Sequence, residues 1–260
     1  MNTAAEEPAE AVLRVRQISK RYRKDVALQE LDLEIPAGEI HGLLGSNGSG
    51  KTTALHMITG ILSADSGTVQ HMGIPLAETA SRLQFGFAPD DLPLPLGLTG
   101  SEFLQLHDAF RDRRDFSRAE EYAGVFGVRD ALSRPMAAYS HGMKRKLQLV
   151  AALMHEPSLL ILDEPFRGLD PQTSGVLEDA ITFFTAAGGS VLMATHDLLR
   201  AQHHCDSLTI LHRGHKVVSG APKALIHEYG SLHACFTSST GTQVEADRRR
   251  DTLRALLVER

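Results

Sequence analysis

The sequence lacks the features that would place it in an oxidising compartment or inside a membrane. Its 260 residues contain no tryptophan and two cysteines, Cys205 and Cys235, too few for a disulfide framework. No window approaches the roughly 18 apolar residues that a membrane-spanning helix requires. The first residues are acidic and rich in alanine, without the positive start and apolar run of a secretory signal. We therefore expect a cytoplasmic protein that serves a membrane only through a partner.

An excess of positive charge is missing too. The chain has 27 Lys and Arg against 32 Asp and Glu, a formal net charge of −5. Because no global basic field draws the chain to nucleic acid, we expect no nucleic-acid partner. What is present is ordinary: 42% hydrophobic and 23% charged residues, enough for one core with a smaller lobe.

Strand-like and helix-like segments alternate along the chain. Short apolar runs, and segments in which apolar and polar residues alternate, predict strands at 12–18, 27–35, 40–44, 67–72, 83–88, 159–162, 190–194, 207–211 and 216–219. Helical spacing predicts helices at 52–59, 173–187, 198–203 and 246–258. The alternation predicts an α/β core with a mainly parallel sheet, and the early alternating strands predict a small antiparallel β lobe. An α-helical subdomain is inserted at about 99–152. We expect 1–11 to be disordered, 12–228 to form the main domain and 229–260 to be a C-terminal appendix.

A glycine-rich loop between a predicted strand and a predicted helix is the first chemical signal. It fits the pattern G-x-x-x-x-G-K-[ST] with the residues Gly45, Ser46, Asn47, Gly48, Ser49, Gly50, Lys51 and Thr52. Such a loop turns successive backbone N–H groups towards phosphate oxygens, and the following helix adds the positive end of its dipole. In this pattern Lys51 reaches the transferred phosphate and the Thr52 hydroxyl reaches Mg²⁺. The loop therefore predicts a nucleoside triphosphate site.

Two carboxylates end a buried strand further along the chain. The run at 159–162 is followed by Asp163 and Glu164. The carboxyl ends of parallel strands line the ligand crevice of an α/β sheet. There Asp163 can hold the water shell of Mg²⁺, and Glu164 can accept a proton from an attacking water.

From about residue 12 to about residue 222 the chain resembles the nucleotide-binding domain of ABC transporters, whose core is a P-loop NTPase fold. Beyond the two motifs above, further segments match that family in the expected order. They are Tyr22, where the family has an aromatic ring that stacks on adenine; Ser140, His141 and Gly142, at the signature segment; Gly168, Leu169 and Asp170, at a dimer-contacting loop; and Thr195, His196 and Asp197, at a switch histidine.

The resemblance implies an ATP hydrolase that powers a membrane transporter. It implies a head-to-tail dimer of ATPase subunits, identical or related, and a separate membrane-spanning permease that holds the dimer at the cytoplasmic face. The catalytic residues would be Lys51, Glu164 and His196. ATP would be bound by Tyr22, the loop from Gly45 to Thr52, Thr53 and, from the second subunit, Ser140, His141 and Gly142. The signature style and the short tail are more typical of exporters, and the permease would dock near 93–109.

Three positions depart from the family pattern. Asp90 stands where a longer Gln or Glu contacts Mg²⁺, so the implied metal ligands are Thr52, Asp163 and Asp90. His141 replaces the first glycine of the signature segment, and Arg167 replaces a small polar residue before Gly168. From Asp90 and His141 together we expect slower hydrolysis than in a member with the usual residues.

Two other functions remain open from the sequence. One is a soluble ABC ATPase in translation or DNA processing, although the chain has neither tandem domains, long insertions nor a basic stripe. The other is a regulatory module that binds ATP with weak turnover, which the presence of Lys51, Asp163 and Glu164 disfavours.

Overall fold

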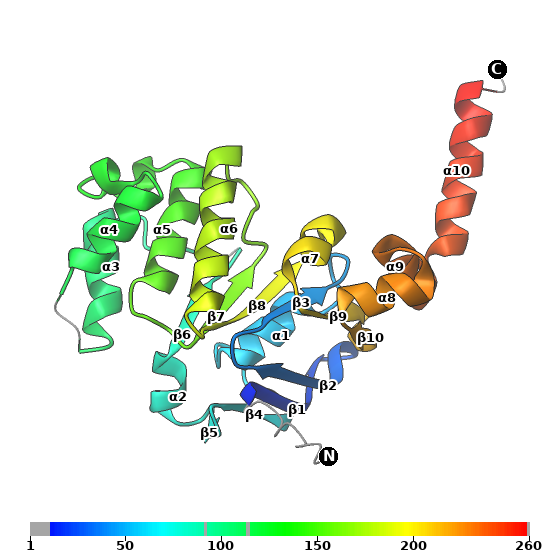
Figure 1. Ribbon diagram of the computed structural model, residues 1–260, viewed down its shortest axis with the longest axis horizontal. Helices are drawn as coiled ribbons and strands as arrows, with labels where there is room; N and C mark the ends of the chain where they lie inside the picture. The colour runs from blue at the N-terminus through cyan, green and yellow to red at the C-terminus, as the bar shows by residue number, and fades with distance from the viewer. Residues whose placement is uncertain (1–10, 91–92, 113–114, 259–260) are drawn as a thin grey trace, which may run out of the picture.

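The computed structural model describes residues 11–90, 93–112 and 115–258, and its centre is a six-stranded sheet (Figure 1). The strands lie in the order β10-β9-β3-β8-β7-β6, and all neighbours are parallel except the hairpin β9–β10. Their bounds are Ile40–Leu44 for β3, Phe85–Ala88 for β6, Leu159–Asp163 for β7, Ser190–Thr195 for β8, Ser207–His212 for β9 and His215–Gly220 for β10. Every residue of β3, β7 and β8 is buried, as expected for parallel strands covered on both faces.

The register of the parallel strands brings their carboxyl ends to one edge. Leu44 pairs with Thr195, and Asp163 pairs with Ala194. The loops after β3, β7 and β8 therefore leave the sheet side by side. This is the edge at which α/β sheets bind ligands.

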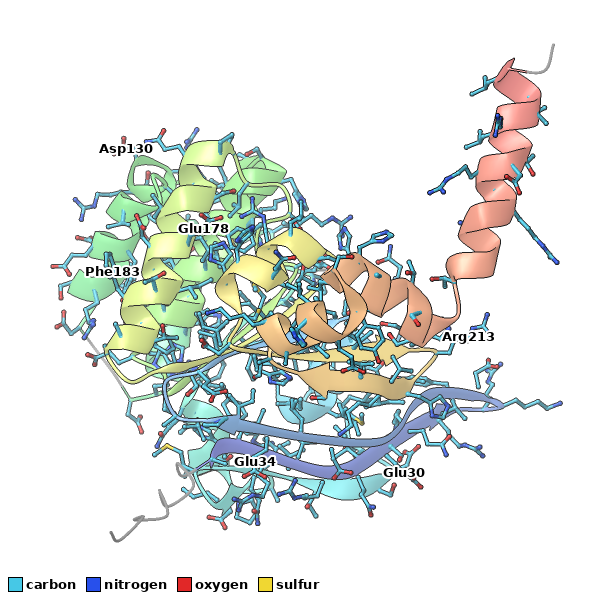
Figure 2. The ribbon with its side chains drawn as sticks, turned by 45° about the vertical axis from the view of Figure 1, so that its right-hand side comes forward. Glu30, Glu34, Asp130, Glu178, Phe183 and Arg213 are labelled. Atoms are coloured by element: carbon cyan, nitrogen blue, oxygen red, sulfur yellow. The ribbon has the colours of Figure 1, made fainter. Side chains whose placement is uncertain are left out.

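The early strands form the predicted antiparallel lobe. Its order is β2-β1-β4-β5, with bounds Ala11–Tyr22 for β1, Asp25–Pro36 for β2, Ser66–His71 for β4 and Ile74–Pro75 for β5. Helix α1 (Lys51–Ile58) lies between this lobe and the main sheet, because Leu55 and Ile58 share one buried cluster with residues of both sheets. Glu30 and Glu34 lie on this lobe, on the opposite side of the molecule from Asp130 (Figure 2).

The inserted segment is helical. It holds α3 (Gly100–Ala109), α4 (Ser117–Val125) and α5 (His141–Leu153), with short 3₁₀ turns at Arg129–Ala131 and Met136–Ala138. Thr99 starts α3 with a reciprocal cap: its hydroxyl accepts from the Glu102 N–H while the Glu102 carboxylate accepts from the Thr99 N–H. Helix α5 also packs against β6, so it connects the subdomain to the core sheet.

The helices of the second half of the chain come after strands β7, β8 and β10. They are α6 (Pro171–Ala186), α7 (Leu198–His204), α8 (Pro222–Tyr229), α9 (Leu232–Thr240) and α10 (Gln243–Val258). The composition change near residue 229 does not mark the edge of the core, because Leu232 and Cys235 belong to the same buried cluster as β7 and β8. Helix α10 alone extends away from the body (Figure 1).

The predicted fold class is confirmed, with shifts at element ends. The strand expected at 83–88 begins at Phe85, because residues Thr79–Leu83 form a short helix, α2. The helix expected at 246–258 begins at Gln243. The expectation for residues 1–10 lies outside the described part of the chain. No helix in that part is both long enough and apolar enough to cross a bilayer.

Candidate functional site

The glycine-rich loop lies between β3 and α1, as its sequence pattern requires. Gly50 has φ 108°, and a Cβ there would lie 2.7 Å from the carbonyl oxygen of Ala27. The Lys51 ammonium folds back into the loop and donates to the carbonyl oxygens of Gly45 at 2.7 Å and Ser46 at 3.3 Å. Burial lowers the pKa of Lys51, an effect that Glu164 and Asp163 oppose. The loop thus holds a cation at the positive end of a helix, an arrangement suited to phosphate.

A hollow of about 670 Å³ surrounds this loop. Most of the residues that the sequence assigned to the nucleotide and metal meet here. It is lined by Ala27, Ser46, Asn47, Gly48, Ser49, Gly50, Lys51, Thr52, Thr53, Asp90, Asp163, Glu164, Arg167 and His196. We refer to it as the phosphate pocket.

Asp163 and Thr52 supply oxygen ligands at the floor of the phosphate pocket. The Thr52 hydroxyl donates to Asp163 Oδ2 at 3.1 Å. Burial raises the pKa of Asp163 to about 6, the nearby carboxylates of Asp90 and Glu164 add to the rise, and the Thr52 hydrogen bond and Lys51 oppose it. Since Mg²⁺ prefers carboxylate and hydroxyl oxygen, these residues fit that metal.

Glu164 is held by the next strand of the sheet. Its carboxylate accepts from the Thr195 hydroxyl at 3.1 Å and lies 2.8 Å from His196 Nδ1. The same carboxylate is 3.9 Å from Lys51 Nζ. Glu164 has φ 45°, a left-handed conformation that is uncommon for a residue with a side chain and often occurs at functional sites. The predicted catalytic residues Lys51, Glu164 and His196 therefore lie together.

Asp90 lies in the phosphate pocket but is ion-paired with Arg167. The Arg167 side chain comes from the loop after β7, and Asp90 from the segment after β6. Two departures from the family pattern, far apart in sequence, are thus in contact.

Arg145 is a site residue that the sequence analysis did not find. It is 3% exposed, and its guanidinium donates to the carbonyl oxygens of Pro89, Asp163 and Pro165. It therefore joins α5 to the segments that carry Asp90 and Glu164. A cation in a helix gives no sequence signal of burial. Thr195 was also unassigned, although its place beside His196 at a strand end could have indicated it.

Five predicted nucleotide-binding residues are not among those that line the phosphate pocket of their own chain: Gly45, whose carbonyl oxygen accepts from Lys51, and Tyr22, Ser140, His141 and Gly142. Tyr22 is 49% exposed, at the end of β1. Ser140 caps α5, its hydroxyl accepting from the Met143 N–H at 3.2 Å. The ring of His141 packs against Gly168, and a Cβ added at Gly142 would lie 3.1 Å from the Gly168 carbonyl oxygen. The signature segment thus contacts the loop after β7, not the phosphate loop.

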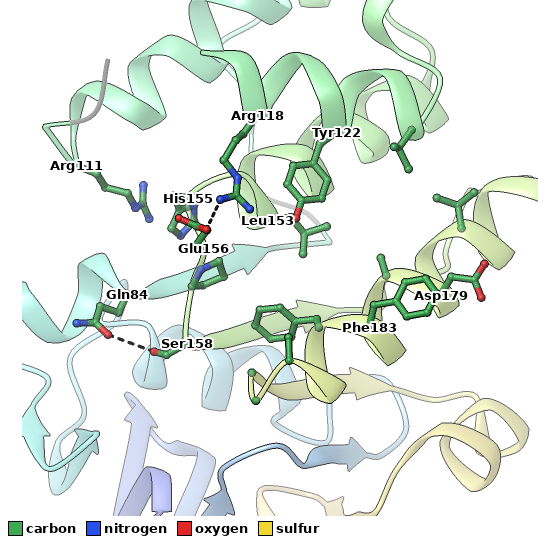
Figure 3. A pocket seen from close by; sticks show the side chains of 18 of the residues that line it. Gln84, Arg111, Arg118, Tyr122, Leu153, His155, Glu156, Ser158, Asp179 and Phe183 are labelled. Carbon is green, nitrogen blue, oxygen red and sulfur yellow. Dashed lines mark hydrogen bonds and ion pairs between the residues drawn. The ribbon is translucent and has the colours of Figure 1, made fainter. Parts of the chain in front are cut away.

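A larger hollow, about 1,130 Å³, lies between α4 and α6 (Figure 3). Tyr122 and Phe183 contribute aromatic rings to it, and Arg118 forms an ion pair with Glu156. None of the motif residues lines it, and it has no glycine-rich loop. This hollow is larger than the phosphate pocket, but a nucleotide needs the glycine-rich loop and the lysine that, of the two, only the phosphate pocket contains.

Comparison with known proteins identifies the family. Residues 28–167 match the profile of the ABC transporter family. The chain is 33% identical to a Nod factor export ATP-binding protein of Sinorhizobium fredii, with 87% of this chain and 68% of that protein aligned. The chain belongs to the ABC transporter family of ATP-binding proteins. It is an ATP-binding, ATP-hydrolysing subunit of that family, and the alternative of a soluble factor in translation or DNA processing is not favoured.

Other relatives of this ABC ATPase support the assignment. A daunorubicin resistance ATP-binding protein of Streptomyces coeruleorubidus is 32% identical, with 93% of this chain and 82% of that protein aligned. A solved structure described as the ATP-binding subunit of an ABC transporter matches with a TM-score of 0.82 at 31% identity, covering 88% of this chain and 99% of that one. A solved structure described as the ADP conformation of an ATP-binding cassette of an ABC transporter, at 22% identity and with a TM-score of 0.69, shares the fold.

Proposed function

We propose that this ABC ATPase binds ATP with Mg²⁺ in the phosphate pocket and hydrolyses it through Glu164. The arrangement of Glu164 carries this proposal, since one carboxylate is held by Thr195 and His196 and lies 3.9 Å from Lys51 Nζ. Lys51 and the loop N–H groups bind the β- and γ-phosphates, and Glu164 takes the proton of the attacking water. His196 holds Glu164 in place and contacts the γ-phosphate.

Mg²⁺ would be held by Thr52 and Asp163, and when bound it neutralises charge on the phosphates. Burial makes the charged form of Asp163 costly and raises its pKa to about 6, and a bound cation would offset that cost. Asp90 is a further oxygen ligand only when it is separated from Arg167.

A second ATPase subunit completes the site. Ser140, His141 and Gly142 lie outside the phosphate pocket of their own chain, so they are available to cover the pocket of another. In a head-to-tail pair, each signature segment would contact the ATP of its partner. ATP then closes the pair, and loss of the γ-phosphate opens it.

A separate permease would contact this ABC ATPase beside α3. A groove of about 320 Å³ lies there, and its apolar walls include Phe87, Pro93, Leu94, Pro95 and Phe103. Apolar side chains at its edge are exposed, among them Ile61. Such a groove suits an apolar helix end of a membrane protein. Docking there would hold the chain at the cytoplasmic face of the membrane.

Export is the direction we propose for the transport. The support comes from the names of relatives, which include an export protein and a drug-resistance protein. The cargo would be recognised by the permease, because the phosphate pocket is assigned to nucleotide.

The test is the Glu164→Gln variant of the full chain, studied with and without Mg-ATP. We expect its hydrolysis to fall at least about 100-fold, as for loss of a general base, while ATP binding persists. Sedimentation should show an ATP-dependent dimer in this variant. Glu121→Gln, at an exposed position outside the pocket, should hydrolyse ATP at the wild-type rate. Unchanged hydrolysis in Glu164→Gln would refute the assignment of the base, and a monomer in Mg-ATP would refute the composite site.

A further inference from the structure

The ion pair between Asp90 and Arg167 forms part of the lining of the phosphate pocket. The Asp90 side chain is 12% exposed, whereas that of Arg167 is 58% exposed. The carboxylate is thus the more buried half of the pair, and the guanidinium is the more solvent-exposed half. Both residues line the same hollow as the glycine-rich loop.

A phosphate group bound in this pocket would meet few cations. Asp90, Asp163 and Glu164 oppose Lys51 and Arg167, so in the described lining the Asp and Glu carboxylates outnumber the Lys and Arg cations. A terminal phosphate group carries about −1.5 to −2 charges at pH 7 and presents three acceptor oxygens. It therefore offers a guanidinium more negative charge and more acceptor oxygens than one carboxylate does, and a planar fork of donors fits its oxygens.

The backbone on both sides of the pair is held by another residue. Arg145 donates to the carbonyl oxygen of Pro89, directly before Asp90, and to that of Pro165, two residues before Arg167. The Arg167 N–H also donates to the Glu164 carbonyl oxygen at 3.0 Å. The two loops can therefore stay in place while the Arg167 side chain changes partner.

We propose that Arg167 is a nucleotide-reading residue of this chain, held on Asp90 without nucleotide and transferred to the γ-phosphate of ATP in the same chain's pocket. ADP has no γ-phosphate, so it leaves the guanidinium on Asp90. Arg167 then contributes to the preference for ATP over ADP before any second subunit binds. This inference rests on the proposed assignment of the phosphate pocket to ATP.

The experiment measures ATP and ADP dissociation constants of the full chain by calorimetry, at concentrations where sedimentation shows a monomer. Arg167→Ser should weaken ATP binding about tenfold, the effect of losing one charged hydrogen-bonding partner, and change ADP binding less than about twofold. Arg167→Lys, which keeps the charge without the fork, should lie between. Arg14→Ser is the matched control, because Arg14 is also an exposed arginine paired with a carboxylate, Glu34, but lies on the β lobe.

Three results would overturn the inference. Equal losses of ATP and ADP affinity would mean that Arg167 acts on the pocket as a whole. If the ATP and ADP affinities are unchanged but the ATP-dependent dimer is weaker, Arg167 contacts the second subunit. If the affinities are unchanged and only Tm falls, the ion pair between Asp90 and Arg167 serves stability alone. In each case the wild type still binds ATP, so the proposed function stands. A wild type that failed to bind ATP would overturn both.

Discussion

Replacing Arg145 with methionine is expected to destabilise the fold by about 3–5 kcal/mol, the usual cost of breaking a buried charged network. The guanidinium donates to three carbonyl oxygens, of which the contact to Pro165 is long at 3.4 Å. The other two, to Pro89 and Asp163, contribute about 1.5–3 kcal/mol each as hydrogen bonds from a charged donor. The neighbouring carboxylates of Asp163 and Glu164 would also lose a compensating charge.

Urea and thermal unfolding measure this effect. For a chain of this size the loss corresponds to a fall in Tm of roughly 6–20 °C. Lys144→Met is the matched control, because Lys144 is the preceding cation on α5 but is half-buried and should change stability by less than about 0.5 kcal/mol. Arg145→Lys should be intermediate, since one ammonium cannot reach all the carbonyls. If the Arg145→Met variant has the same urea midpoint and the same Tm as the Lys144→Met variant, the buried guanidinium does not hold the two loops together.

Two further predictions concern the carboxylates of the phosphate pocket, and a third concerns the signature segment. Without nucleotide or Mg²⁺, Asp163→Asn should raise stability at pH 8 by about 1–3 kcal/mol, because a carboxyl whose pKa rises from 3.8 to about 6 on folding costs about 3 kcal/mol when ionised. Between pH 3.8 and about pH 6 the folded chain binds more protons than the unfolded chain, so the stability of the wild type falls as pH rises. Denaturant titrations check this, and a stability gain of Asp163→Asn that persists below pH 4 would contradict it. Thr195→Val removes the 3.1 Å hydrogen bond to Glu164 and should lower kcat about tenfold with little change in KM, whereas a change confined to KM would assign Thr195 to binding. His141→Gly should raise turnover about two- to fivefold by removing the ring that packs against Gly168, and equal rates would show that turnover does not depend on this ring.

Much of the fold and of the pocket could be predicted from the sequence because its signals are local. The glycine spacing and Lys51 need only a strand before them and a helix after them. The run that ends in Asp163 and Glu164 is a fully buried strand, and parallel strands share an edge. The start of β6 was less predictable, since an apolar residue such as Leu83 fits a helix end as well as a strand.

Other features depend on which loops meet, and only the tertiary structure decided them. Asp90 and Arg167 are separated by 77 positions, and no local pattern predicts their ion pair. Nothing in α5 distinguishes Arg145, which is buried against three carbonyls, from the neighbouring Lys144. The sequence by itself determined the chemistry, because phosphate binding needs particular residues at fixed short spacing. The structure determined the partners of each charge, because hydrogen bonds and ion pairs act over a few ångströms in space, whatever the separation along the chain.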